Sequence, residues 1–136
     1  MAERQQQAQQ FIDALHALET GTDAAAEQIS ALFSDDAVLT NAALNLVDKE
    51  YTGREGVREF WQAYRGLFAD IYSEFAHVTS DTDAAGLFWT SKGTYADGKP
   101  VEYDGVSLLV FGADDKISRF RGYYDTRQLS RTVEAD

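Results

Sequence analysis

The sequence has no cysteine and a single proline, Pro100, among its 136 residues. A chain without cysteine forms no disulfide and no thiolate metal site, and it has no cysteine nucleophile. It also lacks a run of about 18 apolar residues that could cross a membrane, and its polar N-terminal segment lacks the apolar stretch of a secretion signal. We therefore expect a cytoplasmic protein with no membrane partner.

Histidine is scarce as well, because the chain has only His16 and His77. Neither has a second ligand at metal-binding spacing, and the paired aspartates lack the loop spacing of a calcium site. The glycine-rich loop that cradles phosphate groups and the G-x-S-x-G turn of serine hydrolases are absent too. The sequence therefore predicts neither a metal site nor a cofactor.

Positive charge is in deficit, with 12 Lys and Arg against 23 Asp and Glu, which gives a net charge of -11. This charge repels the phosphate backbone of nucleic acids, so we expect no nucleic-acid partner. The acidic residues are dispersed along the chain, which is typical of a solvated surface rather than of a cation site.

Hydrophobic periodicity divides the chain into a helical first half and a strand-rich second half. In chain order it predicts helix 3–19, helix 23–33, strand 37–41, helix 55–68, strand 71–80 and three long strands within 84–125. This order is typical of an α+β fold, in which helices cover one face of a curved antiparallel sheet. We expect one domain, residues 1–136.

Two further helix starts carry capping signals. Thr52 followed by Glu55 is a capping-box pattern ahead of the helix at residues 55–68. Asp125 followed by Gln128 is a similar pattern, which predicts a short C-terminal helix with Asp125 as its N-cap. Asp125 is therefore interpreted as a structural residue rather than a catalytic acid.

The predicted sheet and helices face each other with many aromatic side chains. Strand residues alternate between two faces, and the face expected to meet the helices carries Tyr103, Ser107, Leu109, Phe120, Gly122 and Tyr124. Trp61, Tyr64 and Phe68 lie on the helix opposite. This arrangement predicts a cavity for a hydrophobic small molecule. The alternative is that the aromatic side chains fill this space as an ordinary core.

The order of elements resembles the cone-shaped nuclear transport factor 2-like fold and, within it, the SnoaL-like group. Four stretches carry the resemblance over nearly the whole chain: LFSDDAVLTN, YTGREGVREFW, LFWTSKGTY and DDKISRFRGYYDTRQL. The resemblance implies an α+β cone with a deep pocket and a homodimer packed through the sheet. Members of the group include ketosteroid isomerases, limonene-epoxide hydrolases, polyketide cyclases and proteins that only bind ligands.

The resemblance also implies where catalytic groups of the ketosteroid isomerases would lie. Their general-base aspartate corresponds to Asn41, and their oxyanion-hole acid corresponds to Ser107. An amide takes up no proton at neutral pH, and a serine hydroxyl is a weaker donor than a protonated carboxylic acid. The chain therefore lacks the two acids that this isomerase chemistry uses.

The epoxide hydrolases give a second set of correspondences. Asn41 matches their water-holding asparagine, and their tyrosine corresponds to Leu39. Their arginine and first aspartate fall near Lys92 and Thr94, and their second aspartate falls at Gly122. The loss of both carboxylates removes the acid–base groups that those enzymes use.

Two hypotheses follow: a binding protein for a hydrophobic small molecule, or an enzyme that performs isomerisation, cyclisation or water addition by acid–base chemistry. The candidate catalytic residues are Asn41, Lys92 and Tyr124. Lys92 would serve as a base if burial lowered its pKa, and otherwise it is a solvated strand lysine. The candidate pocket residues are Leu39, Trp61, Tyr64, Phe68, Thr94, Tyr103, Ser107, Leu109, Phe120 and Gly122.

Overall fold

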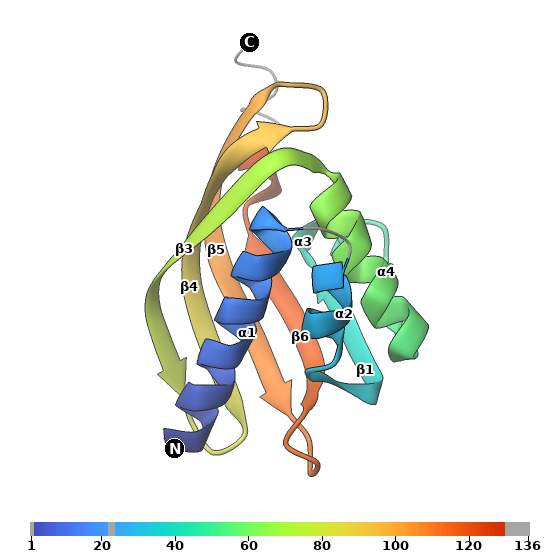
Figure 1. Ribbon diagram of the computed structural model, residues 1–136, viewed down its shortest axis with the longest axis vertical. Coiled ribbons are helices and arrows are strands. Elements are labelled where there is room, and N and C mark those ends of the chain that lie inside the picture. Colours follow the sequence, from blue (N-terminus) through green and yellow to red (C-terminus); the bar gives the residue numbers. More distant parts are fainter. Residues whose placement is uncertain (1, 22–23, 130–136) are drawn as a thin grey trace.

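The computed structural model describes residues 2–21 and 24–129, in which helices pack on one face of a curved sheet that does not close (Figure 1). The helices are α1 (Ala2–Thr20), α2 (Ala24–Ser30), α3 (Ala42–Asn45) and α4 (Gly53–Gly66). The strands are β1 (Phe33–Asn41), β2 (Tyr51–Thr52), β3 (Phe68–Ser80), β4 (Ala84–Tyr95), β5 (Pro100–Phe111) and β6 (Ile117–Tyr124). The predicted α+β class is therefore confirmed.

The strands form one six-stranded sheet in the order β2-β1-β6-β5-β4-β3. All neighbouring strands are antiparallel except β1 and β6, which run parallel. Because they run parallel, the carboxyl ends of β1 and β6 meet, and Asn41 lies beside Gly122. The topology thus brings two residues together that are far apart in the sequence.

Two segments differ from the sequence prediction. Phe33 does not end the second helix but begins β1, where it pairs with Ile117 and is buried against the helices. The predicted start of that helix, residue 23, lies outside the described residues. The segment after Asn41, for which the sequence predicted no helix, contains the short helix α3, with the Asn41 side chain as its cap.

The two capping signals have different outcomes. Thr52 occupies the N-cap position of α4, but its side chain makes no capping hydrogen bond, so the predicted capping box is wrong in that respect. A helical segment does follow Asp125, at residues 126–129. The Asp125 carboxylate accepts a hydrogen bond from the Arg127 backbone N–H at 2.9 Å. The rest of the expected C-terminal helix lies outside the described residues.

The hydrophobic core lies between α1, α2, α4 and the inner face of the sheet. Its largest fully buried side chains are Phe11, Leu18, Ile29, Leu39, Leu87, Leu109 and Val57. Their spacing explains the fold, because the helical residues recur on one helix face and the strand residues all occupy inward positions. This core packs the helices against the inner face of the sheet.

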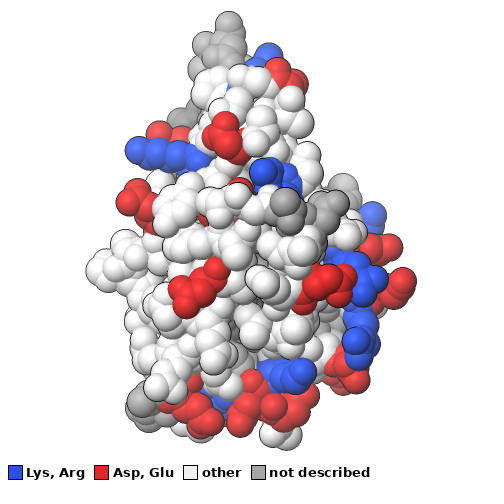
Figure 2. All heavy atoms as spheres, in the orientation of Figure 1, with Lys and Arg blue, Asp and Glu red and all other residues white. Residues whose placement is uncertain are grey.

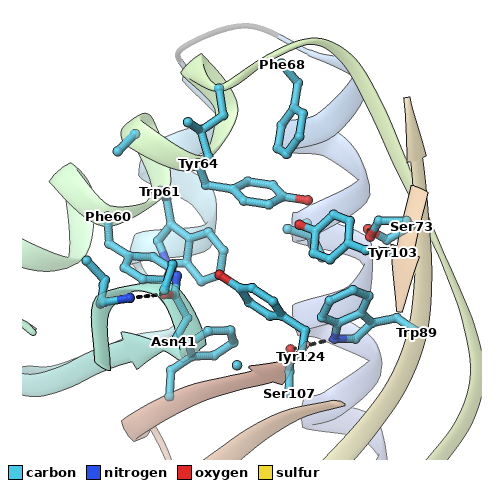
Figure 3. Close-up of a pocket in the computed structure, with 18 of the residues that line it drawn as sticks. Asn41, Phe60, Trp61, Tyr64, Phe68, Ser73, Trp89, Tyr103, Ser107 and Tyr124 are labelled. Atoms are coloured by element: carbon cyan, nitrogen blue, oxygen red, sulfur yellow. Dashed lines mark hydrogen bonds between the residues drawn. The ribbon is translucent and has the colours of Figure 1, made fainter. Parts of the chain in front are cut away.

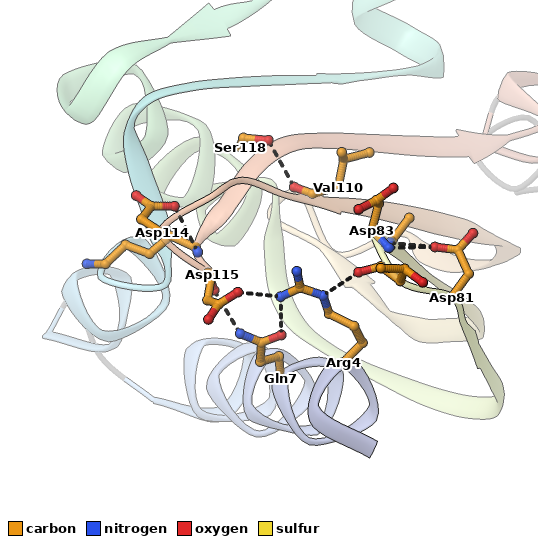
Figure 4. Close-up of polar contacts among 11 residues, drawn as sticks. Arg4, Gln7, Asp81, Asp83, Val110, Asp114, Asp115 and Ser118 are labelled. Atoms are coloured by element: carbon orange, nitrogen blue, oxygen red, sulfur yellow. Dashed lines mark hydrogen bonds and ion pairs between the residues drawn. The ribbon is translucent and has the colours of Figure 1, made fainter. Parts of the chain in front are cut away.

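Polar contacts fasten the N-terminal end of α1 to two turns of the sheet (Figure 4). The Arg4 guanidinium donates to the Thr82 carbonyl at 3.0 Å and to the Asp115 carboxylate at 3.1 Å, and it lies over the Phe111 ring. Gln7 donates to the Asp115 carbonyl at 2.8 Å. These contacts fix the angle at which α1 crosses the sheet, and so the position of its other end.

On the face that Figure 2 shows, charged side chains are spread out rather than gathered in one patch. On the face shown in Figure 2, acidic side chains occur from one end to the other and are interspersed with Lys and Arg. Within the described part of the chain, no helix is both long and apolar enough to span a membrane. The same residues hold no group of three or more His, Cys, Asp or Glu side chains that could bind a metal ion.

Candidate functional site

A cavity of about 390 Å³ lies between the inner face of the sheet, α1, α3 and α4 (Figure 3). Its walls are mostly aromatic, with a few hydroxyl groups and one amide. Of the residues singled out from the sequence, those that line the cavity are Asn41, Trp61, Tyr64, Phe68, Tyr103, Ser107, Phe120, Gly122 and Tyr124. Strand alternation and helical periodicity thus brought most of the candidate residues to one place.

Strand register arranges the sheet side of the cavity in three cross-strand rows. The rows are Leu87, Ser107, Gly122 and Asn41; then Phe75, Trp89, Gly105 and Tyr124; then Ser73, Ser91 and Tyr103. The first and third rows carry polar groups, whereas the middle row is aromatic apart from its glycine and the tyrosine hydroxyl. The cavity therefore has two polar regions separated by an aromatic band.

The first polar region consists of Asn41, Ser107 and Tyr124, which we call the donor group. The Asn41 Oδ1 accepts a hydrogen bond from the Leu44 N–H at 2.9 Å, which leaves the amide Nδ2 with its hydrogens free. Asn41 is therefore held by the first turn of α3. Burial, the larger effect, raises the pKa of Tyr124, and a backbone interaction with Ala43 lowers it.

Ser107 completes the donor group in the same manner. Its Oγ accepts a hydrogen bond from the Trp89 Nε1 at 2.9 Å. Among the described residues, no group accepts a hydrogen bond from the Asn41 amide, the Ser107 hydroxyl or the Tyr124 hydroxyl. Asn41 and Ser107 thus accept hydrogen bonds within the protein, and all three residues keep a hydrogen that they can donate.

The second polar region was missed by the sequence analysis, and we call it the Glu19 cluster: Glu19, Tyr64, Ser73 and Ser91. Glu19, at the end of α1, is only 2% exposed. Its carboxylate accepts hydrogen bonds from the Tyr64 hydroxyl at 2.6 Å, the Ser73 N–H at 2.9 Å and the Ser73 hydroxyl at 2.6 Å. Ser73 and Ser91 are in turn 2.5 Å apart through their hydroxyl oxygens.

One signal in the sequence could have indicated Glu19. It follows the buried Leu15 by four residues, so it lies on the same face of α1 one turn later. A glutamate is expected to be exposed unless it has partners, and those partners are on β3 and α4. Tyr64, Ser73 and Ser91 line the cavity, and the carboxylate lies behind them.

The cavity tyrosines remain protonated at neutral pH. Burial, followed by the charge of Glu19, holds the pKa of Tyr64 well above its usual value. Burial is also the main cause that raises the pKa of Tyr103 and that of Tyr124. These hydroxyls can therefore donate or accept hydrogen bonds, but they do not supply a base at neutral pH.

Two candidate residues on β4 lie outside the cavity. Lys92 and Thr94 occupy the outer face of the sheet, whereas Ser91 and Tyr95, one residue away, line the cavity. The Lys92 side chain is 65% exposed and its Nζ is 3.8 Å from the Glu102 carboxylate. A one-residue difference in register moves a strand residue to the opposite face, and this corrects the predicted catalytic role of Lys92.

Two candidate pocket residues belong to the core instead. Leu39 and Leu109 are both 0% exposed and pack within the main hydrophobic cluster. Both point toward the helices, as expected, but in the part of the cone that side chains fill. The direction of a strand side chain therefore does not tell whether it meets a cavity or a packed core.

Comparison with known proteins identifies the family. The model of the SnoaL-like domain matches residues 8–120. The chain belongs to the SnoaL-like family. The sequence matches no curated protein.

Solved structures agree with this assignment at the level of the fold. An NTF2-like protein of unknown function from Burkholderia pseudomallei aligns with a TM-score of 0.81 and 15% identity, covering 98% of each chain. TerC, co-crystallised with polyporic acid, aligns at 0.78 with 16% identity over 97% of this chain and 98% of TerC. The epoxide hydrolase/cyclase-like enzyme SalBIII aligns at 0.75 with 12% identity over 93% and 94%.

The side chains that line the cavity of this SnoaL-like protein are aromatic, aliphatic, hydroxyl or amide groups. Among the described residues, no aspartate or glutamate lines the cavity. Asn41, Ser107 and Gly122, which by the resemblance were expected to match carboxylate positions of related enzymes, all line it. Within residues 2–21 and 24–129 the buried carboxylate is that of Glu19, which approaches from α1 and lies behind a layer of hydroxyl groups.

Proposed function

We propose that this protein binds an apolar, largely aromatic small molecule in the cavity between the sheet and the helices. The aromatic walls support this proposal, and the volume of about 390 Å³ suits a small organic ligand. The donor group supports a further detail, because its three hydrogen-bond donors, the Asn41 amide and the Ser107 and Tyr124 hydroxyls, suit an acceptor oxygen such as a carbonyl or ether. The related TerC structure, with its bound organic acid, is in keeping with such a ligand.

The alternative function is an enzyme that acts on the same class of molecule. One observation favours it, because hydrogen-bond donors placed around a carbonyl oxygen stabilise negative charge that develops there. The cavity walls, however, offer no carboxylate and no lysine as a base among the described residues. We therefore propose binding as the function that the geometry supports best.

Tryptophan fluorescence offers a direct test, since both tryptophans of the chain, Trp61 and Trp89, line the cavity. We expect β-methylnaphthalene to change this fluorescence in a saturable manner. In the variant Gly122→Val the new side chain should occupy the cavity, because a Cβ at this position makes only ordinary contacts, the nearest at 3.4 Å. We expect at least about tenfold weaker binding in that variant, the loss of roughly 1.4 kcal/mol of apolar contact.

The control is Arg119→Val, on the exposed outer face of the same strand, which should bind the probe as the native chain does. Equal affinity in Gly122→Val and the native chain would place the probe elsewhere and contradict the proposal. Failure of the native chain to bind any aromatic hydrocarbon would contradict it as well.

We also propose that two copies of the chain associate through the outer face of the sheet. Phe88, Val106 and Tyr123 form a cross-strand row on that face, and Phe88 and Tyr123 are 39% and 45% exposed. A second copy would cover this apolar row. We expect sedimentation velocity to show a dimer that Val106→Glu converts to a monomer. A native chain that sediments as a monomer at all concentrations would contradict this.

A further inference from the structure

We infer that the Glu19 cluster is a second ligand-binding point in the cavity. The cluster accepts a hydrogen bond from a hydroxyl group of the ligand. This inference rests on the proposed function, because it concerns the same cavity. It assigns a ligand chemistry to a cluster of which the sequence indicated only Tyr64. The ligand would carry an acceptor oxygen at the donor group and an alcohol or phenol at the Glu19 cluster.

The direction of each hydrogen bond in the cluster follows from the atoms involved. The Glu19 Oε1 accepts from the Ser73 N–H, which can only donate. The Glu19 Oε2 accepts from both the Tyr64 hydroxyl and the Ser73 hydroxyl, each at 2.6 Å. A carboxylate is an acceptor only, so these two hydroxyl hydrogens are committed to Glu19.

The direction of the next hydrogen bond is then fixed as well. Ser73 has one hydroxyl hydrogen and gives it to Glu19, so Ser91 must be the donor in the contact between the two serines. Ser91 therefore has no hydrogen left for a ligand, and Tyr64 has none either. What both residues present toward the cavity they line is oxygen lone pairs. Glu19 thus makes this wall of the cavity an acceptor surface without touching the ligand itself.

Tyr103 explains why a hydroxyl is the best match for this surface. It is the direct cross-strand neighbour of Ser91 and lines the cavity. No described residue accepts a hydrogen bond from its hydroxyl, which is protonated at neutral pH. A ligand hydroxyl can donate to Ser91 or Tyr64 while it accepts from Tyr103, so both of its hydrogen-bonding roles are filled.

The two polar regions also set the length of the ligand. Tyr103 and Ser107 lie on the same strand four residues apart, which corresponds to about 13 Å along a strand. The aromatic band of Trp89 and Tyr124 lies between them. A rigid aromatic or polycyclic molecule with polar groups at its two ends fits this spacing.

A purely structural role for Glu19 is the competing explanation. The carboxylate does connect α1 with α4 and β3. Burying a charge is costly, however, and a well-packed apolar side chain commonly stabilises such a position as well or better. If Glu19 only connected these elements, the affinity of the cavity would not depend on the polar group of a ligand. That dependence therefore distinguishes the two explanations.

The test uses two isosteric pairs of probes, measured by tryptophan fluorescence at neutral pH. The affinity for β-naphthol relative to that for β-methylnaphthalene reports recognition of a hydrogen-bond donor on the ligand. The affinity for β-methoxynaphthalene relative to that for β-ethylnaphthalene reports recognition of an acceptor on the ligand. We expect the native chain to bind β-naphthol about tenfold more tightly than β-methylnaphthalene, as expected for one or two net hydrogen bonds. Ser91→Ala should reduce that preference to about threefold or less.

Ser107→Ala is the matched variant, because it removes a serine from the other polar region on the same inner face of the sheet. It should reduce the preference for β-methoxynaphthalene rather than that for β-naphthol. Glu19→Gln should have the sharpest effect. In this variant the glutamine Nε2 takes the place of Oε2 and donates to the hydroxyl oxygens of Tyr64 and Ser73. The hydroxyl hydrogens of Tyr64 and Ser73 then no longer point to residue 19, and that of Ser91 no longer points to Ser73. The affinity for β-naphthol relative to that for β-methoxynaphthalene should then fall by about tenfold.

The outcomes separate this inference from the proposed function. If the aromatic hydrocarbons do not bind, the proposed function fails and the inference fails with it. If they bind but β-naphthol binds no more tightly than β-methylnaphthalene, only the inference is overturned. The same holds if Ser107→Ala, rather than Ser91→Ala, removes the preference for β-naphthol. If Glu19→Gln does not fold, the two serine variants decide. Ser91→Ala should reduce the preference for β-naphthol, and Ser107→Ala should reduce that for β-methoxynaphthalene.

Discussion

Replacing Gly105 with alanine should lower the free energy of unfolding by about 3 kcal/mol, at the upper end of the usual cost of overpacking. A Cβ at this position would lie 2.3 Å from the Tyr123 carbonyl oxygen and 2.9 Å from the Trp89 ring. The carbonyl belongs to the neighbouring strand β6 and cannot move without breaking the pairing. Chemical unfolding followed by circular dichroism measures this loss.

Gly66 provides the matched control for Gly105. It is the last residue of α4, and a Cβ there would meet nothing within 4 Å. Gly66→Ala should therefore raise the free energy of unfolding by about 0.5–1 kcal/mol, because alanine restricts the unfolded chain and favours a helix. Equal stability of the two alanine variants would show that β5 and β6 do not approach each other at Gly105 as described.

The second large effect is expected for Phe120→Ala, with a loss of about 4 kcal/mol. Phe120 is 5% exposed, and its ring lies 5.2 Å from that of Trp61, 5.6 Å from Phe60 and 5.8 Å from Phe11. Truncation removes these contacts and leaves a void beside the existing cavity, into which neither β6 nor the helices can collapse. The same unfolding measurement reports the loss, and the tryptophans of the native chain are retained as a second signal.

Arg119→Ala is the control for Phe120, since the two residues are adjacent on β6 and Arg119 faces outward. It should change the free energy of unfolding by no more than about 0.5 kcal/mol. A loss below about 1.5 kcal/mol in Phe120→Ala would mean that the aromatic cluster is loosely packed. The cavity would then be less well defined than the ring contacts indicate.

The sequence determined the fold class and the faces of the main elements, for a simple physical reason. The period of hydrophobic residues is a property of each segment alone, so the spacing of Trp61, Tyr64 and Phe120 suffices to place them on inward faces. Strand alternation likewise placed Ser107 and Tyr124 on the inward face, whereas Asn41 was indicated only by the resemblance to related enzymes. The structure also shows why a glycine stands at position 105 of β5, because the neighbouring strand and the Trp89 ring approach it closely.

The register of the strands could not be obtained from hydrophobic periodicity. Lys92 and Ser91 are neighbours in the sequence, and the resemblance to other families placed the polar position of β4 only to within one residue. On a strand that one residue decides between solvent and cavity. The exposed Lys92 and the buried Ser91 show how much chemistry depends on it.

Glu19 shows the other limit of the sequence. Helical spacing places it on the face of Leu15, but nothing in the first twenty residues explains a buried carboxylate there. Its partners come from α4 and β3, at sequence separations of 45 and 54 residues. The sequence by itself determined which way each side chain points along its own helix or strand. Only the tertiary structure decided which of them meet, because burial of a charge depends on hydrogen-bond donors that distant segments bring to it.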